Sequence, residues 1–171
     1  WLKVELLVSE NAPEQEIQTL IQRILGFNPD SEKALYEQAL YLLRKNMIAE
    51  AKMPLSRLVK LPVNNADYQW MYAGVLLRLK EYEAAFEQYE ALKSNEAYRP
   101  GALEALEEIC EALGKKEELL KIYSALLELH PREWKYCRAK LAILIRDKRE
   151  EEALETLNAW HAGNSESFES L

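Results

Sequence analysis

The sequence predicts an all-α protein built from antiparallel helix pairs. Three observations lead to this fold class. Helix-breaking residues are scarce, with 5 Gly and 6 Pro among 171 residues, while Leu, Ala, Glu and Lys are abundant. Like residues recur at intervals of 34 positions. The breakers that do occur fall where one helix should give way to the next.

A repeat with a 34-residue period organises the chain. Three columns of apolar residues fall at i, i+4 and i+7 of one helix, so they form its buried face. These columns are Ile17, Ala51, Ala85, Leu119 and Ala153; Ile21, Leu55, Tyr89, Tyr123 and Leu157; and Ile24, Leu58, Leu92, Leu126 and Trp160. A fourth column, on the other helix of each pair, is Val8, Leu42, Leu76, Cys110 and Leu144.

Each repeat is expected to hold a first helix, A, and a second helix, B. The A helices are predicted at residues 1–9, 32–44, 66–79, 100–113 and 134–146, and the B helices at 13–26, 48–60, 82–94, 116–129 and 150–161. Breakers separate them at "NAP" 11–13, "NPDS" 28–31, "LPVNN" 61–65, "RPG" 99–101, Gly114 and "HPRE" 130–133. The predicted repeats are therefore 1–31, 32–65, 66–99, 100–133 and 134–161, followed by a polar tail at 162–171.

The pattern resembles the tetratricopeptide repeat family, which places Trp, Leu-Gly and Tyr on helix A and Ala, an aromatic residue and Pro on helix B. The fourth repeat carries it as Leu103, Leu106, Cys110, Gly114, Leu119, Tyr123, Leu126, Leu127 and Pro131. The resemblance covers residues 1–161. It implies a right-handed α-α superhelix, or solenoid, whose concave groove is lined by A helices and binds a partner peptide or helix.

Some positions depart from the family pattern. The small-residue place on helix A holds Ala39 and Ala73, but Glu107 and Leu141 in later repeats, which should alter the local helix packing. Lys140 stands where an apolar residue is expected. Trp1 occupies the fourth place of its repeat, so we interpret the sequence as a fragment of a longer protein.

Charge and cysteine content exclude several function classes. The net charge of −7 disfavours nucleic acid and anionic membrane surfaces as partners, and no apolar run is long enough to span a bilayer. Cys110 and Cys137 lack a paired spacing and read as small buried hydrophobes. We expect a cytoplasmic location, with the reservation that a targeting segment could precede the sequence.

The sequence holds no motif for nucleotide binding, zinc proteolysis or serine hydrolysis. His130 and His161 are not at metal-ligand spacing from each other or from a cysteine. The glutamate runs are typical of solvated helix faces. We therefore predict no enzyme activity, no catalytic residue, no metal ligand and no cofactor.

Removing the packing columns leaves the A-helix residues that should face the groove. They are Tyr36, Leu40 and Leu43 in the second repeat; Trp70, Gly74 and Leu77 in the third; Glu104, Glu108 and Glu111 in the fourth; and Arg138, Ala142 and Ile145, with Lys135 and Arg146 nearby, in the fifth. This predicts an apolar floor, then an acidic patch, then a basic patch. Gly74 leaves room for a partner's anchor residue between Trp70 and Leu77. The alternative is that these aromatics complete the core or lie under a covering segment of the same polypeptide.

The leading hypothesis is a non-catalytic adaptor or scaffold that binds a protein or peptide partner. The Lys and Asn that some co-chaperone members use to hold a carboxylate are replaced here by Tyr36, Leu40, Trp70 and Gly74, which disfavours a chaperone-tail ligand. Two alternatives remain open: self-association into a homo-oligomer through the solenoid ends, near Lys140 and Trp160, and an accessory domain of a larger signalling protein or enzyme. RNA binding is the weakest hypothesis, because the period is 34 and the charge is negative.

Overall fold

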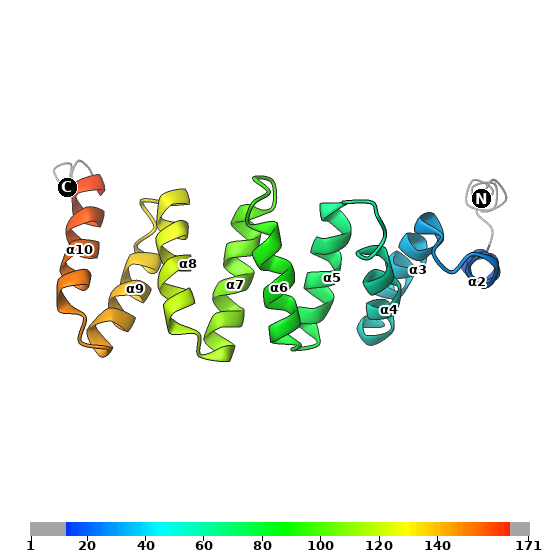
Figure 1. Cartoon of the computed structure of the whole chain (residues 1–171), viewed down its shortest axis with the longest axis horizontal. Coiled ribbons are helices and arrows are strands. Elements are labelled where there is room, and N and C mark those ends of the chain that lie inside the picture. Colours follow the sequence, from blue (N-terminus) through cyan, green and yellow to red (C-terminus); the bar gives the residue numbers. More distant parts are fainter. Residues whose placement is uncertain (1–12, 165–171) are drawn as a thin grey trace. The chain divides into compact units, whose positions relative to one another are not determined.

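The computed structural model describes residues 13–164. Within this range the chain forms nine α-helices and no strand, as Figure 1 shows. The A helix predicted at residues 1–9, with Trp1, lies outside the described residues, and so does the predicted tail beyond residue 164. The chain divides into two compact parts, Trp1–Glu81 and Tyr82–Leu171, which are described separately. The boundary falls inside the predicted repeat 66–99, and the division into five repeats stays a prediction.

The N-terminal part contains α2 (Glu14–Phe27), α3 (Glu32–Arg44), α4 (Ile48–Leu58) and α5 (Ala66–Arg78). Each helix packs against the next one along the chain. The core between them is apolar and closely filled. Its buried members are Leu35, Ala39, Ala51, Leu55, Leu58 and Val75. The small residues Ala39 and Ala73 are fully buried, so a larger side chain at either position would require the neighbouring helices to move apart.

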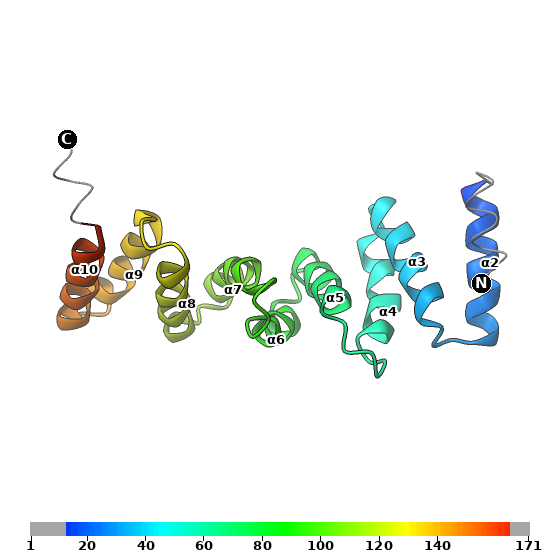
Figure 2. The same cartoon turned by 90° about the horizontal axis from the view of Figure 1, so that it is seen from above.

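The C-terminal part contains α6 (Tyr82–Leu92), α7 (Arg99–Leu113), α8 (Lys116–Leu129), α9 (Trp134–Arg146) and α10 (Glu150–Asn164). Sequential helices again pack on one another. Figure 2 shows the A helices α7 and α9 in one layer and the B helices α6 and α8 in the other. The fully buried core of the C-terminal part includes Leu92, Leu106, Ile109, Leu126 and Leu144.

The turns from helix A to helix B repeat one backbone structure. Asn46, Lys80, Gly114 and Lys148, each 34 residues from the next, have φ angles of 58°, 59°, 66° and 60°. The amide that follows each of them donates a 2.9 Å hydrogen bond to a carbonyl five residues earlier in the helix, as Met47 does to Leu42. This left-handed residue with its backward bond is a common way to end a helix. Only one of the four positions is glycine.

The observed helices follow the predicted ranges closely, with one instructive difference at the C-terminal end. Helix α10 continues to Asn164, whereas the last B helix was expected to end at residue 161. The Asn164 side-chain amide donates to the carbonyl of Pro131 at 3.0 Å and to that of Trp160 at 2.8 Å. These bonds tie the last turn of α10 to the α8–α9 connection, so three residues assigned to the polar tail are helical.

Candidate functional site

The predicted apolar floor lies on α3 and α5 of the N-terminal part. All six of its residues are half-buried: Tyr36, Leu40, Leu43, Trp70, Gly74 and Leu77. Tyr36 and Leu43 also pack against the buried core. These two side chains therefore contribute to the core as well as to the surface, which agrees in part with the alternative interpretation that they complete the core.

A second tyrosine fixes the position of Tyr36. The ring of Tyr68 on α5 lies 5.4 Å from that of Tyr36 and is tilted by 45°. The Tyr68 hydroxyl donates a 2.7 Å hydrogen bond to the Glu32 carboxylate at the start of α3. Burial, followed by the bond to this carboxylate, raises the pKa of Tyr68 to about 12, so the hydroxyl stays a donor. The two A helices are thus joined by an aromatic contact and a charge-assisted hydrogen bond.

Tyr68 was missed as a candidate from the sequence, because it falls 34 residues after Ala34, a packing position. Ala34 is fully buried, and so is Ala102 in the next repeat. The same column holds Tyr136 in the fifth repeat, so a large polar-tipped side chain that alternates with alanine was the available signal.

The predicted acidic patch lies on α7 of the C-terminal part, where Glu104, Glu108 and Glu111 are all exposed. Between them, Glu107 is half-buried, and burial is the largest cause of its raised pKa. The Tyr123 hydroxyl of α8 donates to Glu111 Oε1 at 3.4 Å and also bonds the Glu107 carboxylate. The glutamate row is therefore partly anchored in the helix packing.

The predicted basic patch lies on α9. Arg138, Lys135 and Arg146 are exposed, and Ile145 beside them is 63% exposed. The ammonium of Lys135 lies 4.5 Å from the centre of the Tyr136 ring. Its charge also lowers the pKa of Glu107, which places the basic end of α9 within electrostatic range of the α7 glutamates.

The predicted groove residues thus form two groups, one on α3 and α5 and one on α7 and α9. Each group belongs to a different compact part of the chain. A groove that continues from the apolar floor to the charged patches stays a prediction.

Lys140 and Trp160 do not form the exposed end surface that was considered for self-association. Both are half-buried, and with residues of α8 they line a hollow of about 260 Å³. Trp160 also packs against Trp134, with ring centres 4.8 Å apart. Trp134 is itself 43% exposed, and two further exposed apolar residues of this end, Leu154 and Leu157, lie on α10.

The two cysteines are buried within the helix packing. Cys110 and Cys137 are free and buried, and burial raises the pKa of Cys110 to about 11. A thiol with this pKa is protonated at neutral pH and is a poor nucleophile. Between residues 13 and 164, no three His, Cys, Asp or Glu side chains are grouped so as to hold a metal ion. None of the helices in that range has the length and apolarity to cross a membrane.

No protein-family model matches this sequence, and no curated protein matches it. Solved structures with the same fold include YrrB, described as a TPR protein with an unusual peptide-binding site. It is 19% identical over 93% of this chain and 81% of its own, with a TM-score of 0.66. MamA AMB-1 is 15% identical over 86% of this chain and 81% of its own, with a TM-score of 0.67. MamA 41-end from Desulfovibrio magneticus RS-1 is 18% identical over 93% and 89%, with a TM-score of 0.60. At these identities the likeness shows the fold, and it confirms the all-α helical-repeat class.

Proposed function

Starting from the tetratricopeptide repeat fold of this chain, we propose that it is a non-catalytic interaction module that binds a peptide or helix of a partner protein on its A-helix face. The observation that carries the proposal is the aromatic and aliphatic surface of α3 and α5. Leu40, Trp70 and Leu77 remain half-exposed on this surface, although other apolar residues of the same helices form a buried core. A peptide-binding site is also described for YrrB.

The surface is suited to receive an apolar anchor residue. Tyr36 is held by Tyr68, and Tyr68 is held by Glu32, so the ring of Tyr36 is fixed before a partner arrives. A fixed aromatic surface loses little side-chain entropy on binding, which favours affinity. Half-exposed aromatic residues are frequent energetic centres of interfaces.

The charged patches of α7 and α9 would add specificity on the A-helix face of the C-terminal part. Exposed Glu104, Glu108 and Glu111 favour a basic segment, and Arg138 favours an acidic one. Because these side chains are exposed, their contribution would appear mainly in the association rate and in its dependence on salt.

Affinity purification of the full-length protein tests this function. Trp70→Ala and Tyr36→Ala should each reduce recovery of the partner at least tenfold. Phe27→Ala is the matched control, because Phe27 is an 88% exposed aromatic of the same part of the chain and lies outside this face. Circular dichroism should confirm that the variants are folded. Full partner recovery by folded Trp70→Ala and Tyr36→Ala proteins would show that the proposal is wrong.

We also propose a cytoplasmic location for the module, which its two free cysteines support because unpaired thiols are common in reducing compartments. Imaging of the tagged full-length protein in intact cells tests this location, and retention in a membrane-bounded or extracellular compartment would contradict it.

A further inference from the structure

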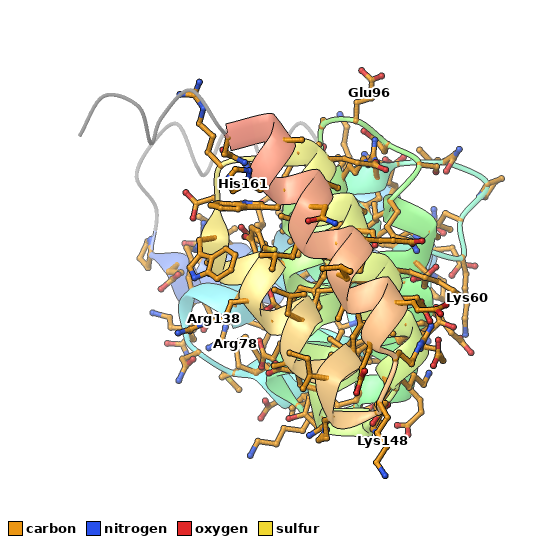
Figure 3. All side chains as sticks on the ribbon, turned by 90° about the vertical axis from the view of Figure 1, so that its left-hand side faces the viewer. Lys60, Arg78, Glu96, Arg138, Lys148 and His161 are labelled. Atoms are coloured by element: carbon orange, nitrogen blue, oxygen red, sulfur yellow. The ribbon has the colours of Figure 1, made fainter. Side chains whose placement is uncertain are left out.

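Helix α10 carries apolar residues on a flank that no described helix covers. Leu154 is 60% exposed and Leu157 is 40% exposed. Figure 3 looks onto this helix, which lies nearest to the viewer between the labelled Lys148 and His161. Two large aliphatic side chains one turn apart on the same flank make an apolar strip rather than scattered exposure.

The places that correspond to Leu157 in the earlier repeats are buried. Leu157 stands in the column of Ile21, Leu55, Tyr89 and Tyr123, which are 1%, 0%, 3% and 2% exposed. Leu154 stands 34 residues after Leu120, which is 6% exposed, whereas Lys52 and Phe86 at the same place of earlier repeats are half-buried. In each earlier case the next A helix packs on this B helix: α3 on α2, α5 on α4, α7 on α6 and α9 on α8. The repeat therefore shows what kind of element fits this flank, namely a helix of the A type.

The α8–α9 interface shows which charges accompany such a helix. Lys116 Nζ at the start of α8 lies 2.6 Å from Asp147 Oδ1, in the turn after α9. Glu117 Oε1 lies 2.8 Å from Arg149 Nη1 in the same turn. The α2–α3 interface repeats this arrangement with the charges exchanged, because Lys45 Nζ in the turn after α3 lies 2.7 Å from Glu14 Oε2 at the start of α2. The start of a B helix thus pairs with the turn that follows the covering A helix.

On α10 the residues that correspond to Lys116 and Glu117 are both acidic. They are Glu150 and Glu151, and Glu155 lies one turn further on; all three are exposed. A covering helix that matched this surface would carry an apolar stripe and a basic turn. Two α10 helices packed in parallel would instead bring together two acidic ends.

We propose that the Leu154–Leu157 flank of α10 binds a basic amphipathic helix of a partner polypeptide, seated as α9 is seated on α8. This surface is separate from the A-helix face of the proposed function, and the two can succeed or fail independently. The partner's apolar side chains cover Leu154 and Leu157, and its basic residues face Glu150 and Glu151.

The chain itself offers a probe of the required chemistry, the α9 sequence with its turn, WKYCRAKLAILIRDKR (134–149), with Lys in place of Asp147, because the residue at that place would face Glu150. A fluorescent peptide of this sequence, with Ala in place of Cys137, is titrated with the full chain and binding is followed by anisotropy. Leu157→Gln should weaken binding at least tenfold. Glu150→Lys together with Glu151→Lys should weaken binding and reduce its dependence on salt. A scrambled peptide of the same composition should bind at least tenfold more weakly.

Ile145→Gln is the matched control. Ile145 belongs to the same part of the chain and is 63% exposed, but it lies on the A helix α9. This variant should bind the peptide as the unaltered chain does. Loss of binding in Ile145→Gln, with binding kept in Leu157→Gln, would place the peptide on the A-helix face and overturn the proposal.

An isolated peptide must also form a helix on binding, so a second measurement removes this penalty. The peptide is joined to the C-terminus of the full chain by a flexible Gly/Ser linker, which raises its effective concentration to about millimolar. The linked protein should melt at a higher temperature than a linker-only control, and Leu157→Gln should abolish the gain. Failure of both the titration and the linked protein rejects the proposal. Sedimentation that shows a dimer of the unlinked chain, dissociated by Leu157→Gln, would assign the flank to a second copy instead.

Discussion

The most direct test of the backbone described here is replacement of Gly114 by alanine. Gly114 ends α7 with a φ of 66°, in the left-handed region. A Cβ added there would meet no atom within 4 Å, so the substitution creates no clash. Any loss of stability must therefore come from the backbone conformation itself.

The expected size follows from two opposing effects. A residue with a side chain is disfavoured in the left-handed conformation by about 1–2 kcal/mol. Alanine also restricts the unfolded chain more than glycine does, which stabilises the folded state by about 0.4–1 kcal/mol. Gly114→Ala should thus lower the free energy of unfolding by about 1 kcal/mol, or the melting temperature by about 2–4 °C for a chain of this size.

The chain provides matched controls for this substitution. Gly26 is exposed within α2, has no positive φ and has nothing within 4 Å of an added Cβ. Gly26→Ala should raise stability by about 0.5–1 kcal/mol, because alanine favours the helix. Lys148 has a φ of 60° at the corresponding turn, so Lys148→Gly should also stabilise the chain.

Urea unfolding of the full chain, followed by circular dichroism, measures all three variants. Opposite signs for Gly114→Ala and Gly26→Ala are the decisive result. If the two alanine variants are stabilised alike, residue 114 is not held in the left-handed conformation and the reasoning is refuted.

Three further outcomes are expected. Leu55→Ala should destabilise the N-terminal part by about 2–5 kcal/mol in urea unfolding, because Leu55 is fully buried and its removal leaves a cavity. A loss of unfolding free energy as small as that expected for an exposed leucine would contradict this packing. Cys110 should react with a thiol reagent only after unfolding, since it is buried with a pKa near 11, and rapid labelling of the folded chain would be inconsistent with that burial. Burial raises the pKa of Glu107 above 4.5, so the folded chain holds this proton more tightly than the unfolded chain, and the resulting stability is lost as the pH rises through the folded pKa. Glu107→Gln should therefore be more stable than the unaltered chain at neutral pH, and the difference in unfolding free energy should be smaller in acid. Urea titrations at the two pH values measure this, and a larger stabilisation in acid than at neutral pH would exclude this account.

The helix pairs were determined by the sequence itself. Apolar residues at i, i+4 and i+7 set one face of each B helix, and the 34-residue period brought these faces into columns. Leu55, Tyr89 and Tyr123 of one column are indeed buried. The helix ranges follow because the breakers between helices act locally, through residues that cannot continue a helix or that favour a turn.

Other features depended on contacts between distant residues. Asn46, Lys80 and Lys148 adopt the left-handed turn without a glycine to signal it, because the packing of the two flanking helices imposes the turn. Tyr68 of α5 contacts Tyr36 and donates a hydrogen bond to Glu32, both on α3. The 34-residue period does not predict either contact.

Leu157 shows most clearly the difference between what the local pattern determines and what tertiary contacts determine. Its place in the repeat is the same as that of Tyr123, and the sequence pattern marks both as core residues. Tyr123 is 2% exposed and Leu157 is 40% exposed, because α9 covers α8 and no described helix covers this flank of α10. The local pattern determines which side of a helix is apolar, whereas burial depends on whether another element lies against that side, and only the tertiary structure supplies that neighbour.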